Sequence, residues 1–164
     1  MALQNIDGRC LCGDIRWEAS IDPDLVGVCH CTHCQPVGGS AFQFTTRVAR
    51  DHFTLVNGML TVYEKVVGSG NPRAMSFCGR CATMIHTSNT DSTGLRSLRL
   101  GGCQQKHEFA PQCQFGASQL LVGQYLRVAP QCGAKSWPLS NRRPNSGTLS
   151  RTPGDYRYSS RNAR

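Results

Sequence analysis

The chain has 164 residues, of which 39% are hydrophobic and 17% are charged, and its formal net charge is +8. This length predicts one domain with a modest core, and the 17 glycines favour a turn-rich β protein over a helical bundle. The first residues lack the basic and apolar segments of a secretion signal, and no window holds the roughly 18 consecutive apolar residues of a membrane-spanning helix. We therefore expect a cytoplasmic or nuclear protein with reduced cysteines and no membrane partner.

The positive charge is concentrated near the C-terminal end. Residues 1–114 contain ten Lys/Arg and nine Asp/Glu, a net charge of +1, whereas residues 115–164 contain eight and one, a net charge of +7. The second segment is rich in Ser, Asn, Arg and Pro without apolar periodicity, which is typical of a disordered tail. We expect a solvated tail, with nucleic acid bound at most weakly and without sequence preference. The predicted domain covers residues 5–114 and the tail residues 115–164.

Alternation of polar and apolar residues predicts the first strands. Residues 14–19 place Ile15, Trp17 and Ala19 on one face of a strand that follows two cysteines. Short strands are expected at residues 25–28, 42–48 and 53–56. Asn57 and Gly58 then favour a hairpin that leads into a strand at residues 60–63.

The remaining expected elements are strands as well. Strands at residues 75–77 and 83–86 flank a cysteine pair, as in a zinc knuckle at the tip of a hairpin, and residues 95–100 form another strand. No helical period is sustained before residue 114, so the only helix expected is a short one around residues 31–34. The pattern predicts an all-β fold.

Seven of the ten cysteines form three close groups, and this grouping predicts metal sites. The groups are Cys10 and Cys12; Cys29, Cys31 and Cys34; and Cys78 and Cys81. One C-x-C and one C-x-x-C together complete a closed four-thiolate zinc site, which is usually structural, whereas three thiolates leave a position free for chemistry. We therefore predict two zinc ions with different roles. A redox dithiol at the C-x-x-C lacks the expected βαβ surroundings, and Cys103, Cys113 and Cys132 match no ligand group.

Two histidines leave an alternative open at the middle group. His30 and His33 lie between its cysteines, and either could fill the fourth position and make this site structural as well. Otherwise they lie outside the ligand set. Gly38, Gly39 and Ser40 are small enough to let a ligand approach the metal, or they form a simple loop.

Three motifs together resemble the glutathione-dependent formaldehyde-activating enzyme (GFA) family, which includes centromere protein V. They are GRCLCGDIRW at residues 8–17, CHCTHC at residues 29–34 with GSAF at 39–42, and FCGRC at residues 77–81. The resemblance extends over residues 5–114. It implies a small all-β zinc fold of stacked sheets with zinc knuckles.

The resemblance also implies roles for the cysteines. Cys10, Cys12, Cys78 and Cys81 would hold a structural zinc, and Cys29, Cys31 and Cys34 a catalytic one. The implied activity is that of a carbon–sulfur lyase acting on a thiol adduct, such as the adduct of glutathione with formaldehyde. An open three-thiolate zinc suits this chemistry because coordination deprotonates a thiol at neutral pH. No histidine–carboxylate pair near the cluster stands out as a general base.

The chain also departs from the family pattern. Gln35 and Pro36 replace residues that are usually basic, which weakens the case for an anionic tripeptide, and Ala82 replaces a glycine. Residues 115–120 read FGASQL where family members continue with IW. If one base is restored before the codon of Phe115, the new reading frame can encode IW and then QSA. Our hypothesis is that a one-base deletion or a misplaced intron has replaced the true C-terminus from about residue 115. A genuinely divergent tail is the alternative.

Two other functions compete with the lyase. A non-catalytic zinc-stabilised binding module of the centromere protein V kind would use the basic tail, and its binding to DNA would be salt-sensitive. The second alternative is an inactive remnant of the enzyme with an altered C-terminus.

Overall fold

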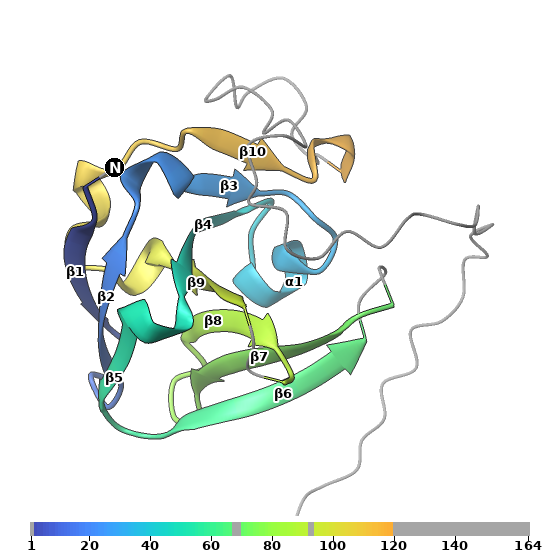
Figure 1. Ribbon diagram of the computed structural model, residues 1–164. Helices are drawn as coiled ribbons and strands as arrows, with labels where there is room; N and C mark the ends of the chain where they lie inside the picture. Colours follow the sequence, from blue (N-terminus) through green and yellow to red (C-terminus); the bar gives the residue numbers. More distant parts are fainter. Residues whose placement is uncertain (1, 67–69, 92–93, 120–164) are drawn as a thin grey trace, which may run out of the picture.

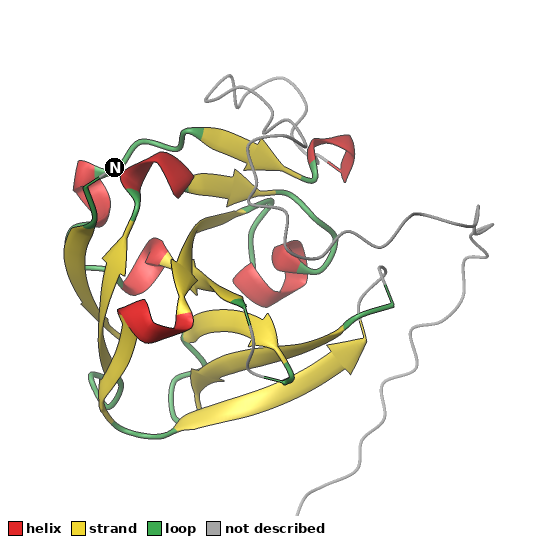
Figure 2. Cartoon of the chain, viewed as in Figure 1, coloured by secondary structure: helices red, strands yellow, loops and turns green. Residues whose placement is uncertain are grey.

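The computed structural model describes residues 2–66, 70–91 and 94–119, which form an all-β fold with short helices (Figures 1 and 2). A three-stranded sheet has the order β1-β2-β5, and a seven-stranded sheet has the order β10-β3-β4-β9-β8-β7-β6. The smaller sheet consists of β1 (Gln4–Arg9), β2 (Arg16–Ile21) and β5 (Phe53–Asn57). The larger sheet consists of β3 (Gly27–Cys29), β4 (Gln43–Ala49), β6 (Leu60–Val66), β7 (Pro72–Cys78), β8 (Met84–Asn89), β9 (Leu95–Arg99) and β10 (Cys113–Phe115). The predicted fold class is confirmed.

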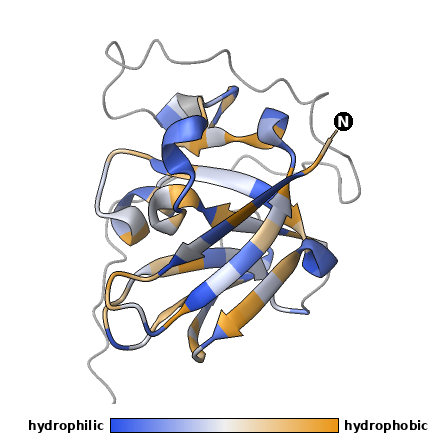
Figure 3. Cartoon of the chain, turned by 90° about the vertical axis from the view of Figure 1, so that its left-hand side faces the viewer, coloured by the Kyte–Doolittle hydropathy of each residue, from blue (hydrophilic) through white to orange (hydrophobic). Residues whose placement is uncertain are grey.

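The two sheets stack over a common apolar core. The prediction that Ile15, Trp17 and Ala19 share a buried face is confirmed, since their exposed fractions are 2%, 1% and 6%. Trp17 stacks on Phe53 within the smaller sheet at a centroid distance of 6.2 Å. Phe53 also meets His86 of the larger sheet edge to face at 5.1 Å. Hydrophilic and hydrophobic bands both occur along the strands of the smaller sheet (Figure 3), as expected for a sheet with one buried face.

The predicted hairpin at Asn57 and Gly58 is wrong. β5 pairs with β2 and β6 pairs with β7, so the turn carries the chain from one sheet to the other (Figure 1). Gly58 has a φ of +86°, and an added Cβ would lie 2.4 Å from the carbonyl oxygen of Asp14. The Asn57 amide donates to the same oxygen at 2.8 Å. Asn57 and Gly58 therefore form the sharp turn that their chemistry predicts. Contacts outside the turn decide that β5 pairs with β2 and β6 with β7.

Two strands and the helix position were not predicted. β1 forms an antiparallel pair with β2, and β10 adds to the edge of the larger sheet in parallel with β3. The short helix α1 (Cys34–Gly38) begins where the predicted one was expected to end, and Gly39 ends it with a φ of 59°. Five other short helices are of the 3-10 type within the described residues, and they are η1 (Pro23–Leu25), η2 (Arg50–His52), η3 (Leu100–Gly102), η4 (Lys106–Glu108) and η5 (Ala117–Gln119). The predicted tail of residues 115–164 lies outside the described residues from residue 120 onward.

Candidate metal centres

The first cysteine cluster joins the two sheets. Cys10 and Cys12 lie in the turn between β1 and β2, while Cys78 ends β7 and Cys81 lies in the turn before β8. All four sulfurs lie within 4.8 Å of one another. The Sγ–Sγ distances are 3.4 Å for Cys10 and Cys12 and 3.7 Å for Cys12 and Cys78. Tetrahedral coordination with Zn–S bonds of about 2.3 Å places sulfurs about 3.8 Å apart, so this donor set fits zinc.

The two turns of the first cluster share a backbone pattern. The Gly13 N–H donates to the Cys10 carbonyl at 3.1 Å, and the Ala82 N–H donates to the Cys78 carbonyl at 2.8 Å. Gly13 and Ala82 both have positive φ values, 83° and 58°. The Ile15 N–H also donates to the Cys10 sulfur at 3.2 Å. Such turns aim two sulfurs at one point and stabilise negative charge on them.

The side chain of Thr83 acts on one sulfur of the same cluster. Its hydroxyl lies 3.2 Å from the Cys81 sulfur, and hydrogen bonds from Thr83 lower the pKa of Cys81 to about 5. A thiolate is the form that binds a metal, so this contact prepares a ligand at neutral pH.

The second cluster lies at the end of β3 and the start of α1. Cys29 ends the strand, Cys31 lies in the loop, and Cys34 is the first residue of the helix. Their sulfurs lie within 4.8 Å of one another and are partly exposed. Hydrogen bonds from Cys29 and Cys34 lower the pKa of Cys31 to about 2. Hydrogen bonds with Cys29 and Cys31 instead raise the pKa of Cys34. Three sulfurs with a stabilised anion among them fit a metal that keeps one position free.

The two histidines of this loop do not join the group of ligand atoms. His30 is fully buried, its Nε2 lies 3.1 Å from the Gln114 amide oxygen, and its ring lies 5.9 Å from that of Phe42. His33 is partly buried and precedes α1. Within the described residues, the grouped donors of this cluster are the three cysteines alone.

Residues 114–119 close over the loop of the second cluster. The His30 N–H donates to the Phe115 carbonyl at 2.8 Å. The Gln119 side chain accepts from the Thr32 N–H at 2.7 Å. Gly116 has a φ of +64°, and an added Cβ would lie 2.9 Å from the Cys31 nitrogen, so only glycine fits there. These first residues of the predicted tail therefore form part of the surroundings of the cluster.

Gln35 connects this closing segment to the loop. Its amide donates to the His30 carbonyl at 2.7 Å and to the Gln119 carbonyl at 2.9 Å. The residue that departs from the family pattern therefore fixes the loop instead of offering a charge.

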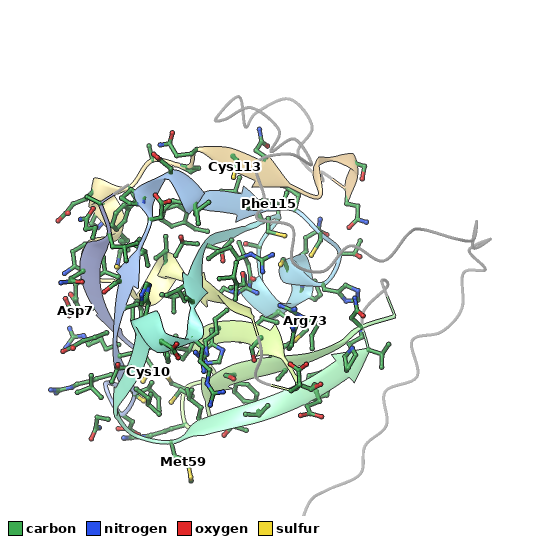
Figure 4. The ribbon with its side chains drawn as sticks, viewed as in Figure 1. Asp7, Cys10, Met59, Arg73, Cys113 and Phe115 are labelled. Carbon is green, nitrogen blue, oxygen red and sulfur yellow. The ribbon has the colours of Figure 1, made fainter. Side chains whose placement is uncertain are left out.

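Three arginines missed by the sequence analysis lie near the second cluster. Arg99 Nη2 is 4.0 Å from the Cys34 sulfur. Burial and the charge of Arg73 lower the pKa of Arg47 to about 10, and the thiolates of Cys29 and Cys34 oppose this shift. Figure 4 shows Arg73 on the side of the molecule that carries α1, away from Cys10. The predicted strands at residues 42–48 and 95–100 held a signal, because Arg47 and Arg99 both fall inside them.

Comparisons with known proteins address the same region. The family model described as "Glutathione-dependent formaldehyde-activating enzyme" matches residues 5–118, which include both clusters and β10. The chain belongs to this family. A solved structure of a Rhodobacter sphaeroides protein is 19% identical and covers 60% of this chain and 87% of that chain, with a TM-score of 0.49. No curated protein matches.

The GFA-type chain carries two cysteine clusters that could bind metal ions, and their soft donors are consistent with zinc. Among the helices of the described residues, none has the length and apolar character needed to cross a membrane.

Proposed function

We propose that this protein is a zinc-dependent carbon–sulfur lyase that acts on a thiol adduct, such as the adduct of glutathione with formaldehyde. The second cluster supports the proposal most directly, because three thiols converge and their group contains no fourth donor from the described part of the chain. In this assignment Cys29, Cys31 and Cys34 are catalytic, and Cys10, Cys12, Cys78 and Cys81 hold a structural zinc.

Zinc held by three thiolates would supply a position that takes up a thiol as its thiolate at neutral pH. In the lyase direction the carbon–sulfur bond of the adduct breaks and its electron pair stays on sulfur. The adduct hydroxyl loses its proton to solvent as the aldehyde C=O bond forms. In the reverse direction the thiolate attacks the aldehyde carbon.

The residues around the cluster suit a thiol ligand. Arg99 Nη2, at 4.0 Å from the Cys34 sulfur, favours negative charge on the sulfurs. Nothing lies within 4 Å of an ideal Cβ at Gly39, so the backbone beyond α1 leaves room for a peptide-like molecule. The cysteines of both clusters are free thiols and so remain available to a metal. The expectation of reduced cysteines is wrong for Cys113, which is disulfide-bonded.

X-ray absorption at the zinc edge tests the proposal on the full chain loaded with zinc. Reduced glutathione should raise the sulfur count from seven, shared by two ions, to eight, whereas S-methylglutathione should leave it unchanged. Cys31→Ser is the control, since it removes a ligand of the site in question. A spectrum that shows His30 or His33 as the fourth ligand and no response to thiols would instead support the binding module.

A further inference from the structure

We propose that Gln43 and Arg99 bind the hydroxyl group of the thiol adduct beside the second cluster. This inference rests on the proposed function, because it requires the sulfur of the adduct to lie at the three cysteines. It adds two substrate-binding residues and the chemical group that they recognise, which the adduct carries next to its sulfur and a free thiol does not.

Both residues lie on the face of the seven-stranded sheet that carries Cys29. Gln43 of β4 pairs directly with Cys29 of β3, and directly paired residues of antiparallel strands have Cβ atoms about 4.5–5.5 Å apart on the same side of the sheet. Arg99 of β9 pairs with Thr45, which is two residues from Gln43 along β4 and therefore points to the same side. The side chains of Gln43 and Arg99 are thus diagonal neighbours beside the cluster.

The guanidinium of Arg99 is fixed within reach of the cluster. Its Nη2 lies 4.0 Å from the Cys34 sulfur and donates to Thr87 at 3.0 Å. Its Nη1 donates to Ser97 and Thr45 at 3.2 and 3.3 Å. The sulfur matches the charge of the guanidinium, but the Nε–H is buried and has no hydrogen-bond partner within the described residues. A buried donor without an acceptor costs free energy, so the Nε–H favours a ligand that brings a neutral acceptor.

The side-chain amide of Gln43 offers the complementary atom. Its Oε1 is buried without a hydrogen-bond partner in the part of the chain that the structure describes, and only 7% of the residue is exposed. The side chain lies against the end of α1, since an added Cβ at Gly38 would lie 2.7 Å from its Cγ and 2.9 Å from its Nε2. An acceptor without a donor therefore lies beside Cys29 and the helix that begins at Cys34.

A hydroxyl group of the ligand satisfies both atoms at once, because a hydroxyl donates one hydrogen bond and accepts others. An amide N–H would satisfy only Gln43, and a carbonyl oxygen would satisfy only Arg99. In the adduct of a thiol with formaldehyde, a single carbon separates the hydroxyl oxygen from the sulfur. A sulfur held at the three cysteines therefore brings this hydroxyl close to the two side chains.

The same contacts suit the reaction in both directions. When the carbon–sulfur bond breaks, its electron pair stays on sulfur and the hydroxyl proton leaves to solvent, so negative charge builds up on the oxygen. The Arg99 Nε–H stabilises this charge, and the Gln43 Oε1 orients the hydroxyl before its proton leaves. In the reverse direction the Nε–H polarises the aldehyde oxygen while the thiolate attacks the carbon.

Calorimetric titration of the full zinc-loaded chain with two matched thiols tests the recognition of the hydroxyl. The probes are 2-mercaptoethanol and propane-1-thiol, which differ by a hydroxyl in place of a methyl group. The hydroxyl-bearing thiol should bind about tenfold more tightly, since the methyl group leaves both polar atoms unpaired. Gln43→Leu should reduce this preference below about threefold, because it removes one of the two partners. Gln104→Leu removes an exposed glutamine instead and should keep the preference unchanged.

Exchange NMR between glutathione and its formaldehyde adduct gives a second measurement, with the hydroxyl one carbon from the sulfur. Gln43→Leu should lower the enzymatic exchange rate about tenfold, whereas its affinity for propane-1-thiol should not fall. A residue with a purely structural role would lower both. Gln43→Asn, which retracts the amide by one methylene, is the second variant if Gln43→Leu does not take up zinc at the second cluster, and it should behave in the same way.

The outcomes separate the two proposals. Equal binding of the two probes would overturn the hydroxyl site and leave the proposed function standing. Binding of neither thiol, together with no enzymatic exchange, would overturn both. A preference or an exchange rate that survives in Gln43→Leu and in Gln43→Asn would show that other residues bind the hydroxyl, and the assignment would be wrong. Zinc content and thermal unfolding of each variant establish that it is folded and loaded.

Discussion

Ala82 shows how one residue affects a zinc turn. It follows Cys81 and has a φ of 58°, and among the described residues it is the sole non-glycine with a positive φ. Its N–H donates to the Cys78 carbonyl, so the turn requires this backbone conformation. The matching position of the other turn carries Gly13, which adopts a φ of 83° without a Cβ penalty. The departure from the family pattern at Ala82 therefore introduces backbone strain.

Ala82→Gly should raise the free energy of unfolding of the zinc-loaded protein by about 1 kcal/mol, since glycine relieves the left-handed strain. Urea unfolding measures the change. Ala110→Gly is the matched control, because Ala110 is also exposed but does not have a positive φ, and there glycine should slightly lower stability. A loss of stability in both variants would contradict the strain at Ala82.

At the scale of elements, the second cluster depends on two parts of the chain that are distant in sequence. β3 and α1 provide its cysteines, while β10 and the helix η5 after it close over the loop (Figure 1). Gln35 donates to carbonyls on both sides of this closure, those of His30 and Gln119. Groups that orient the ligands of a metal typically change its affinity by about 10- to 100-fold.

Gln35→Ala should therefore weaken zinc binding at the second cluster by about tenfold while the fold stays intact. Competition with a chromophoric zinc chelator measures the affinity, and circular dichroism monitors the fold. Gln112→Ala removes an exposed glutamine whose side chain bonds locally to Ala110, so it should leave the affinity unchanged. Equal zinc affinity in Gln35→Ala and the unaltered chain would show that the closing segment does not orient the ligands.

At the scale of the whole molecule, the two clusters differ in what they hold together. The first cluster fastens the β1–β2 turn of one sheet to the β7–β8 turn of the other, and Cys10 and Cys78 belong to the core. The second cluster draws its three sulfurs from residues 29–34, a single short segment of the chain. A metal that bridges distant segments contributes its binding free energy to folding, and for structural zinc this can reach about 10–16 kcal/mol.

Cys78→Ser should consequently abolish cooperative folding, whereas Cys31→Ser should leave a folded chain with one zinc ion fewer. Thermal unfolding and metal content per chain measure the two effects. Similar losses of melting temperature in the two variants would refute this division between the clusters.

The sequence by itself determined the local features of this protein. Ligand spacing depends on a few adjacent residues, so the three cysteine groups could be predicted and the structure brings them together as two clusters. Short apolar-rich runs likewise predicted most strands, and the alternation of residues 14–19 predicted the buried face of Ile15, Trp17 and Ala19. The prediction of a disordered tail lies outside the described residues from residue 120 onward and stays a prediction there.

Tertiary structure decided the features that depend on which strands become neighbours. The Asn57–Gly58 turn predicts a sharp reversal, but only packing decides that β5 joins one sheet and β6 the other. The same pairing brings Arg47, Arg73 and Arg99 to one face from strands up to 52 positions apart in the chain. Residues 115–119 join the second cluster because Gly116 can lie against Cys31 and Gln119 can bond to the loop. No local pattern encodes such contacts, since they form only once the sheet register places the strands side by side.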